Sequence, residues 1–269
     1  MDKVLYLDCS SGISGDMFVA AMLDLGASKE IMLRALNSLL VQGFEVRISR
    51  VEKSGVEACD FLVVLDEKYE NHDHNMQYLH GKTEEHPMEK EIPHEHECRG
   101  IKEIEDIIQG ADMTSGAKKL AMKIFRILAE AEAKAHGVTV EQVHFHEVGA
   151  VDSIADIVSA AVCFDELGIT KTIIPQINDG TGTIRCRHGI LPVPVPAVKN
   201  VDEVHHLNLK IIDVEGELVT PTGAAIAAAI RTDRELPVRY SIQKIGLGAG
   251  KRKYKCSSIL KAILINEEL

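Results

Sequence analysis

The sequence predicts a mixed α/β protein of the α+β type, in which helices pack on a mixed sheet and a histidine-rich mobile loop is inserted. Segments with helical spacing of apolar residues alternate with short strand-like segments, which favours a sheet covered by helices over a pure bundle or sandwich. The hydrophobic fraction of 45% is typical of a globular core. Residues 67–97, by contrast, hold too few large apolar residues to form one.

The first quarter of the chain predicts a strand, two helices and a hairpin. Residues 4–8 form an apolar run typical of a buried strand, and the apolar spacing over 14–25 predicts the helix after it. A second helix is expected over 28–40, beginning at a serine N-cap. Residues 44–51 and 56–65 flank a glycine-containing turn, so they predict a β-hairpin.

The rest of the chain predicts further helices and short strands. Helices are expected over 101–108, 117–135, 152–167 and 221–230, and strands over 172–177, 182–187, 210–214, 238–246 and 258–265. Prolines at 192, 194 and 196 indicate a stiff, extended segment.

Net charge and cysteine usage exclude several classes of protein. The 30 Lys and Arg residues are outnumbered by 41 Asp and Glu, and a net charge of -11 repels nucleic acids and anionic membranes. No apolar run approaches the roughly 18 residues of a membrane span. The six cysteines form no C-x-x-C pair, and no signal peptide is visible. We therefore expect reduced thiols, a cytoplasmic location, and neither nucleic acid nor membrane as a partner.

The polar segment 67–97 divides the chain. Residues 1–66 with 98–269 are expected to form the main metal- and nucleotide-handling region, which could have two lobes. The segment itself contains six histidines, nine acidic residues and three lysines, and we interpret it as a flexible loop. Imidazole suits nickel, copper and zinc, so the loop could capture a metal. The alternative is a solvated linker. The candidate loop ligands are His72, His74, His94 and His96.

A second group of candidate metal ligands lies around an H-x-H motif. If His144 and His146 lie on an extended segment, alternation places both imidazoles on one face. Asp152 and Asp156 share one side of the next helix near its N-terminus. Together with Glu147 they could bind one cation. In the alternative reading Asp152 is only an N-cap and the histidines are hydrogen-bonded packing residues.

Two predicted helix starts could bind a phosphate. The first strand ends at Asp8, a candidate catalytic carboxylate, and the loop after it leads into a helix. At the helix over 221–230, a threonine cap is followed by proline at the first position. Basic residues at 185, 187 and 251–253 could also hold a phosphate, although each stretch alone is more often an exposed turn. The candidate binding residues are Ser11, Gly12, Ser14, Gly15, Asp16, Arg187, His188, Thr220, Thr222 and Gly223.

Four blocks of sequence, taken together, resemble the nickel-insertion protein family called LarC. The blocks are LDCSSGISGDM at 7–17, HFHEVGAVDSIADI at 144–157, HGILPVPVPA at 188–197 and TPTGAA at 220–225. They occur in the family's order, and the histidine-rich insertion also fits. No single block is specific, but the four together are.

The resemblance implies a function and a substrate. The family places Ni(II) into a pyridinium mononucleotide bearing two thiocarboxylates, making two Ni-S bonds and one Ni-C bond. CTP with Mg or Mn belongs to that reaction, and the apoprotein of lactate racemase receives the nickel-pincer product. Forming the Ni-C bond removes a ring proton, so a base is needed. Glu147, His144, His146 and Asp152 are the candidates, with base and ligand roles left open.

Two departures from the family pattern set further expectations. Family members that perform the complete reaction are longer and have a C-terminal domain that binds CTP, which we expect a separate partner to supply here. Residues 182–187 also differ from the glycine-rich run of relatives. Two alternatives stay open: a carrier that stores nickel without chemistry, and a metal-dependent hydrolase built on His144 and His146.

Overall fold

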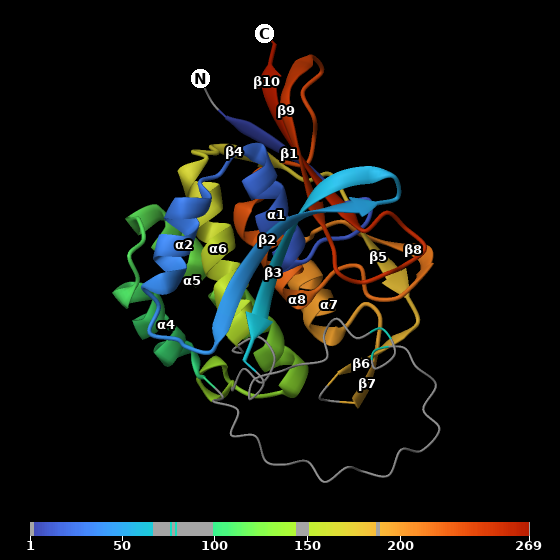
Figure 1. Cartoon of the computed structure of the whole chain (residues 1–269). Helices are drawn as coiled ribbons and strands as arrows, with labels where there is room; N and C mark the ends of the chain where they lie inside the picture. The colour runs from blue at the N-terminus through green and yellow to red at the C-terminus, as the bar shows by residue number, and fades with distance from the viewer. Residues whose placement is uncertain are drawn as a thin grey trace.

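The computed structural model describes residues 3–66, 76, 79, 99–143, 151–186 and 189–268 (Figure 1). Within them a six-stranded sheet has the order β2-β3-β9-β10-β1-β4. Its strands are β1 (Val4–Asp8), β2 (Phe44–Lys53), β3 (Val56–Leu65), β4 (Lys171–Ile173), β9 (Tyr240–Ala249) and β10 (Ile259–Glu267). β1 pairs antiparallel with β10 and parallel with β4, which confirms the predicted mixed sheet.

Helices pack against this sheet and against one another. They are α1 (Gly15–Leu25), α2 (Lys29–Asn37), α4 (Ile101–Gly110), α5 (Ser115–His136), α6 (Val151–Glu166), α7 (Pro196–His205) and α8 (Pro221–Ile230). α1 lies directly on β9, and α5 contacts α6, α7 and α8. Phe18, Phe61 and Phe125 are fully buried in the core between these layers. None of the helices in the described ranges is both long and apolar enough to cross a membrane.

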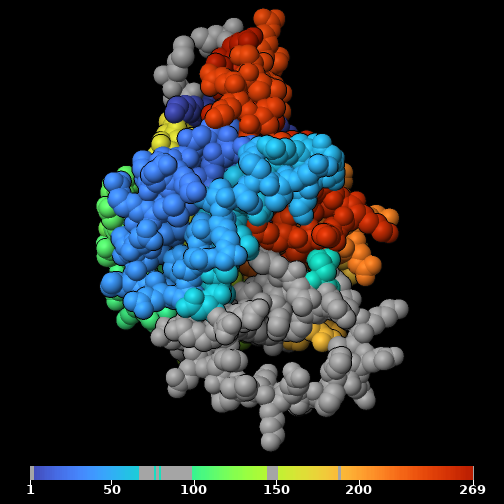
Figure 2. Space-filling view, viewed as in Figure 1, coloured from blue at the N-terminus to red at the C-terminus, as the bar shows by residue number. Residues whose placement is uncertain are grey.

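Two small sheets lie beside the main one (Figure 1). β5 (Ile177–Thr181) pairs in parallel with β8 (Leu209–Glu215), and β6 (Thr183–Cys186) forms a hairpin with β7 (Gly189–Pro192). A short 3-10 helix, η2 (Val140–Gln142), follows α5. In Figure 2 the paired ends of β9 and β10 project from the body of the molecule.

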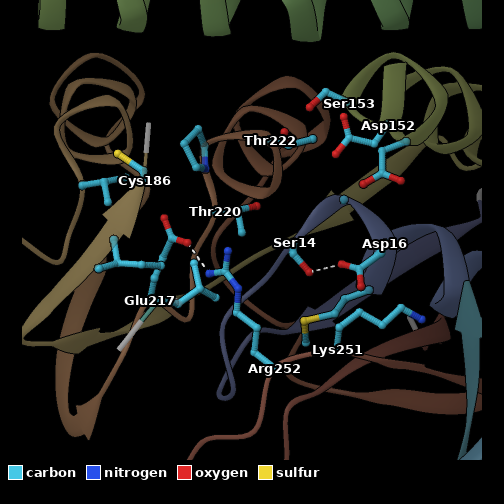
Figure 3. Close-up of a pocket in the computed structure, with 18 of the residues that line it drawn as sticks. Ser14, Asp16, Asp152, Ser153, Cys186, Glu217, Thr220, Thr222, Lys251 and Arg252 are labelled. Atoms are coloured by element: carbon cyan, nitrogen blue, oxygen red, sulfur yellow. Dashed lines mark hydrogen bonds and ion pairs between the residues drawn. The ribbon is translucent and has the colours of Figure 1, made fainter. Parts of the chain in front are cut away.

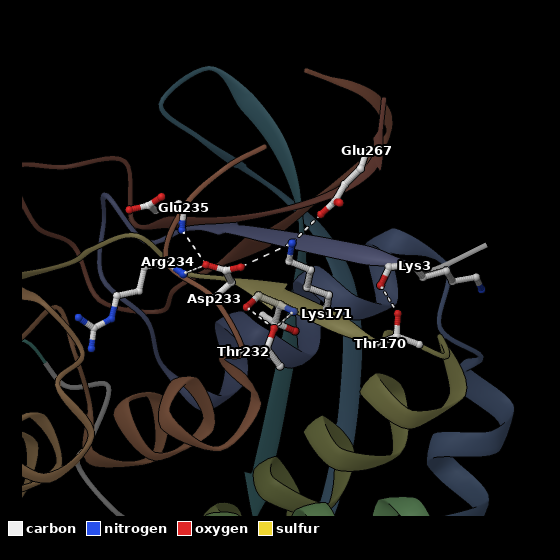
Figure 4. Close-up of polar contacts among 9 residues, drawn as sticks. Lys3, Thr170, Lys171, Thr232, Asp233, Arg234, Glu235 and Glu267 are labelled. Atoms are coloured by element: carbon white, nitrogen blue, oxygen red, sulfur yellow. Dashed lines mark hydrogen bonds and ion pairs between the residues drawn. The ribbon is translucent and has the colours of Figure 1, made fainter. Parts of the chain in front are cut away.

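The edge of the main sheet beyond β4 is covered by residues 232–235 (Figure 4). Thr232 Oγ1 accepts the Thr172 N–H at 2.9 Å, and Asp233 continues the sheet as a bridge to Ile173. Lys171 Nζ lies 3.5 Å from Asp233 and 2.6 Å from Glu267. These contacts satisfy a strand edge that could otherwise pair with another chain.

Most predicted elements are confirmed within a few residues. Ser28 caps α2 as expected, since its Oγ accepts the Ile31 N–H at 3.3 Å, although α2 ends at Asn37 instead of residue 40. Gly137 ends α5 in the left-handed conformation, as the C-cap prediction requires. The hairpin of β2 and β3 is also confirmed.

Three predictions need correction. The single strand expected over 172–177 is wrong, because β4 ends at Ile173 and β5 begins in another sheet after Pro175, which has no N–H to donate. The sequence reasoning missed α7, where Pro196 is the first helical residue and not part of an extended run. Asp152 lies inside α6 and is therefore not its N-cap.

The predicted histidine-rich loop lies almost entirely outside the described residues. One of its two described side chains departs from the expectation of a polar segment. Leu79 is only 4% exposed and packs in the main core.

Candidate functional site

A cavity of about 640 Å³ lies where α1, α6, α7 and α8 begin (Figure 3). Helix N-termini carry backbone N–H groups without partners inside the helix and a partial positive charge, so they favour anionic groups. Four such ends around one cavity make it suited to an anionic ligand. Its volume lies within the range usual for small-molecule sites.

The start of α1 contributes Ser14, Gly15 and Asp16 to the cavity wall. Ser14 occupies the N-cap position in an extended conformation, and its hydroxyl donates to the Asp16 carboxylate. At Gly15 a Cβ atom would lie 2.5 Å from Oδ2 of Asp156, so a larger residue would press on the Asp156 side chain where α1 and α6 meet. The sequence thus places two acidic side chains from different helices side by side.

Asp16, Asp152 and Asp156 form the acidic wall of the cavity. Burial, together with the charges of Asp16 and Asp152, raises the pKa of Asp156 well above its usual value, while Lys251 opposes the shift. Within the described ranges, no three His, Cys, Asp or Glu side chains lie close enough together to hold a metal ion. A metal site here would therefore need ligands from the remaining residues.

The start of α8 forms a neighbouring, uncharged wall with Thr220 and Thr222. Thr220 Oγ1 accepts the Gly223 N–H at 3.1 Å, which confirms the predicted threonine cap. Pro221 follows at the first helical position, where its missing N–H costs nothing.

Two basic residues from the β9–β10 connection line the cavity opposite these walls, and Figure 3 marks the ion pair of one of them, Arg252. Lys251 pairs with Asp60, and Arg252 pairs with Glu217, which is only 7% exposed. These pairs fix both cationic groups at the cavity. Burial raises the pKa of the nearby Tyr254, which also lines the cavity.

An apolar surface completes the cavity. It is formed by the end of β3 with Phe61 and Leu65, by Ile184 and Leu191 of the β6–β7 hairpin, and by Val195 before α7. Apolar walls with a few converging polar groups are the usual composition of a ligand site.

The structure gathers most of the described candidates into this cavity. The predicted residues that line it are Ser11, Ser14, Gly15, Asp16, Asp152, Asp156, Thr220 and Thr222. Asp8, Gly12 and Gly223 are not among the lining residues. Gly12 and Gly223 instead allow close backbone contacts, since a Cβ would lie 2.0 Å from Leu218 O and 2.1 Å from Ile13 O respectively.

The remaining candidates lie outside the described residues. They are His72, His74, His94, His96, His144, His146, Glu147, Arg187 and His188. Sequence reasoning overlooked Glu217, Tyr254 and Asp60, because the tertiary contacts that bring them to the cavity are not visible in the sequence. One local hint is the charge of Glu217, which lies three residues before the capping threonine.

Comparison with known proteins identifies relatives along almost the whole chain. A family model described as "nickel insertion protein" matches residues 5–269. A protein of Alkaliphilus metalliredigens is 49% identical over 99% of this chain and 61% of its own length. Its name is pyridinium-3,5-bisthiocarboxylic acid mononucleotide nickel insertion protein.

Other relatives carry the same name. Proteins of Acetivibrio thermocellus and Clostridium acetobutylicum are 38% and 40% identical, over 98% and 99% of this chain and 60% and 64% of their own lengths. The chain therefore spans about three fifths of the length of these curated relatives. No solved structure matches the chain.

Proposed function

Because the chain belongs to the nickel insertion protein family, we propose that it takes part in placing Ni(II) into a pyridinium-3,5-bisthiocarboxylic acid mononucleotide. This would be the synthesis of a nickel-pincer nucleotide by a cyclometallase of the lyase type. The observation that carries the proposal is one cavity with an acidic wall, an apolar wall and a wall of helix N-termini beside Arg252.

The three walls suit the three parts of such a substrate. The phosphate binds at the start of α8, where Thr220, Thr222 and Arg252 offer hydrogen bonds and positive charge. The pyridinium ring packs on the apolar wall formed by β3 and the β6–β7 hairpin. This orientation directs the reacting ring carbon and the thiocarboxylates toward Asp16, Asp152 and Asp156.

Nickel is a substrate of this reaction. Ni(II) binds one sulfur of each thiocarboxylate, the ring C–H bond breaks, and its electron pair forms the Ni-C bond. The proton passes to a protein base. We propose Asp152 or one of His144, His146 and Glu147 as this base. Asp156 with the two histidines supplies mixed oxygen and nitrogen ligands that suit Ni(II) during delivery.

We further propose that CTP, Mg or Mn, and lactate racemase take part in this synthesis or receive its product. The described side chains do not by themselves fit a divalent ion, since no three possible ligands cluster. Mg or Mn therefore has no part in the steps above, and we propose that CTP binds the portion of the longer relatives that this chain does not match. The loaded nucleotide is then passed to the lactate racemase apoprotein.

The test is a nickel-insertion assay on this chain. It is mixed with the mononucleotide, Ni(II), CTP and Mg, and the nucleotide is analysed by mass spectrometry for bound nickel. A second arm adds, as a separate polypeptide, the portion of the Alkaliphilus metalliredigens relative that this chain does not match. The whole relative is the positive control, and calorimetry measures binding of the mononucleotide to the chain alone.

We expect the chain to bind the mononucleotide and to support insertion in at least the second arm. Nickel binding without mononucleotide binding would contradict the proposal and indicate a carrier. Hydrolysis of the mononucleotide without nickel insertion would indicate a metal-dependent hydrolase instead.

A further inference from the structure

Asp179 on β5 is a fully buried carboxylate that does not line the cavity. Its Oδ1 accepts three backbone N–H groups, from Gly180 at 2.8 Å, Leu218 at 2.9 Å and Val219 at 3.1 Å. Its Oδ2 is buried and has no hydrogen-bond partner among the residues that the structure describes. Burying a carboxylate in this way is costly, so the position calls for a reason.

The backbone of β5 directs this side chain toward residues 217–219. The parallel pairing of β5 with β8 is irregular between Asp179 and Thr181. At Gly180 a Cβ atom would lie 2.0 Å from Gly216 O, so a larger residue would push the two segments apart. Such an irregularity changes the direction in which the neighbouring side chain, here that of Asp179, points.

Residues 217–219 in turn hold the loop before α1. Ile13 donates its N–H to Leu218 O at 3.0 Å, and Thr220 donates its N–H to Ile13 O at 3.1 Å. A chain of hydrogen bonds thus connects Asp179 to two loops. Both loops line the cavity, one with Glu217, Leu218 and Thr220 and the other with Ser11, Ser14 and Gly15.

We propose that Asp179 is the positioning residue of the cavity, which fixes both loops in the arrangement that receives the mononucleotide. The identity of the ligand in this inference rests on the proposed function, whereas the hydrogen bonds that hold the loops do not depend on it. Asp179 touches neither substrate nor reacting atoms. It acts through the amides of Leu218 and Val219, and through Leu218 O on the loop before α1.

At pH 7, above its pKa of about 6, Asp179 is ionised, and three donors converge on its Oδ1. Hydrogen bonds to a charged acceptor are roughly twice as strong as those between neutral groups. Asn keeps the shape and the accepting oxygen but has no charge, whereas Ala removes the acceptor. Asp179→Asn should therefore loosen the two loops, and Asp179→Ala should loosen them further.

The experiment combines hydrogen exchange with calorimetric titration of the mononucleotide. In Asp179→Ala, exchange at the Leu218 and Val219 amides should accelerate at least about tenfold. Mononucleotide affinity should fall about 10- to 100-fold, because the cavity loops are misplaced. Asp179→Asn should show intermediate values for both, and it keeps the test informative if the Ala variant fails to fold.

Asp202→Ala is the matched control. Asp202 on α7 also has a buried oxygen without a hydrogen-bond partner in the described part of the chain, but it does not line the cavity. This variant should leave both loop exchange and affinity unchanged.

Wild-type exchange at Leu218 and Val219 in Asp179→Asn would overturn the inference, as would accelerated exchange spread evenly over the chain. If the wild-type protein does not bind the mononucleotide, the proposed function fails, and the exchange result still decides whether Asp179 holds the loops.

Discussion

Single carboxylates in this protein differ in pKa because their surroundings differ. Burial raises the pKa of Asp179 from 3.8 to about 6, against the three N–H groups that favour its charge. Burial also acts to raise the pKa of Asp8, but hydrogen bonds from Ser10 and Lys261 outweigh it and the pKa lies below its usual value. The two residues should therefore respond oppositely to pH.

Asp179 should make the folded protein less stable as the pH rises. Its protonated form is favoured in the folded state, so its contribution is fully present below about pH 4 and is lost as the pH rises through about 6. A shift of this size corresponds to about 2 to 3 kcal/mol. In urea unfolding, the free energy of unfolding of the wild type should fall relative to that of Asp179→Asn as the pH rises from 4 to 7. The change in the difference between the two proteins should be about that amount.

Asp8→Asn is the control for this prediction. The pKa of Asp8 is lowered, so its contribution is present above its usual pKa and is lost as the pH falls. The variant should therefore lose stability relative to the wild type as the pH rises. If both variants changed in the same direction with pH, the assignment of these environments would be wrong.

At the scale of the element, helix ends and helix contacts form the cavity. Thr220 and Thr114 both cap a helix by accepting a backbone N–H, from Gly223 at 3.1 Å and Ala117 at 3.0 Å. Only Thr220 lines the cavity. Comparing substitutions at Thr220 and Thr114 therefore separates the loss of stability caused by removing a cap from the effect on ligand binding.

Thr220→Ala and Thr114→Ala should each lower the free energy of unfolding by about 1 kcal/mol. Only Thr220→Ala should also weaken mononucleotide binding, because its hydroxyl and the adjacent helix start face the proposed phosphate. Urea unfolding and calorimetry measure the two effects. Equal affinity in the two variants would argue against a phosphate at α8.

The contact between α1 and α6 depends on the absence of a side chain at Gly15. Gly15→Ala should cost about 1 to 3 kcal/mol, since its Cβ would lie 2.5 Å from Asp156 Oδ2. Gly110→Ala in α4 is the matched change, with no atom within 4 Å of the added Cβ, and it should stabilise by up to about 1 kcal/mol. Thermal unfolding of both variants checks the contrast, and destabilisation by Gly110→Ala alone would refute it.

At the scale of the whole molecule, the chain carries a net charge of -11 and a histidine-rich segment. We propose that this segment binds nickel separately from the cavity. Leu79 is buried in the core, so a test deletion should leave it in place.

Deleting residues 81–97 should reduce the number of nickel ions bound, because it removes His86, His94 and His96. The unfolding transition should stay unchanged, since the deleted residues contain few large apolar side chains. Calorimetric titration with nickel and thermal unfolding check both expectations. Unchanged stoichiometry would remove the storage role.

The sequence predicts those structural features that residues close to one another in the chain determine. Ser28, Thr220 and Gly137 mark helix ends by patterns within four residues, and all three are confirmed. α7 was missed because its proline start was interpreted as part of an extended run. Asp179 was missed for a different reason: its partners Leu218 and Val219 lie about 40 residues away, and no local pattern encodes them.

The place of β1 in the sheet affects how the protein is made. β1 lies between β4 and β10, and Val4 pairs with Ile265 at the other end of the chain. During synthesis on the ribosome β1 emerges before its antiparallel partner β10, and residues 9–258 separate the two strands in the sequence. Until then Leu5 and Leu7, which are fully buried in the finished protein, belong to an apolar strand with an open edge. The nascent chain therefore carries an aggregation-prone segment until β10 has been synthesised, which is the condition that chaperones relieve.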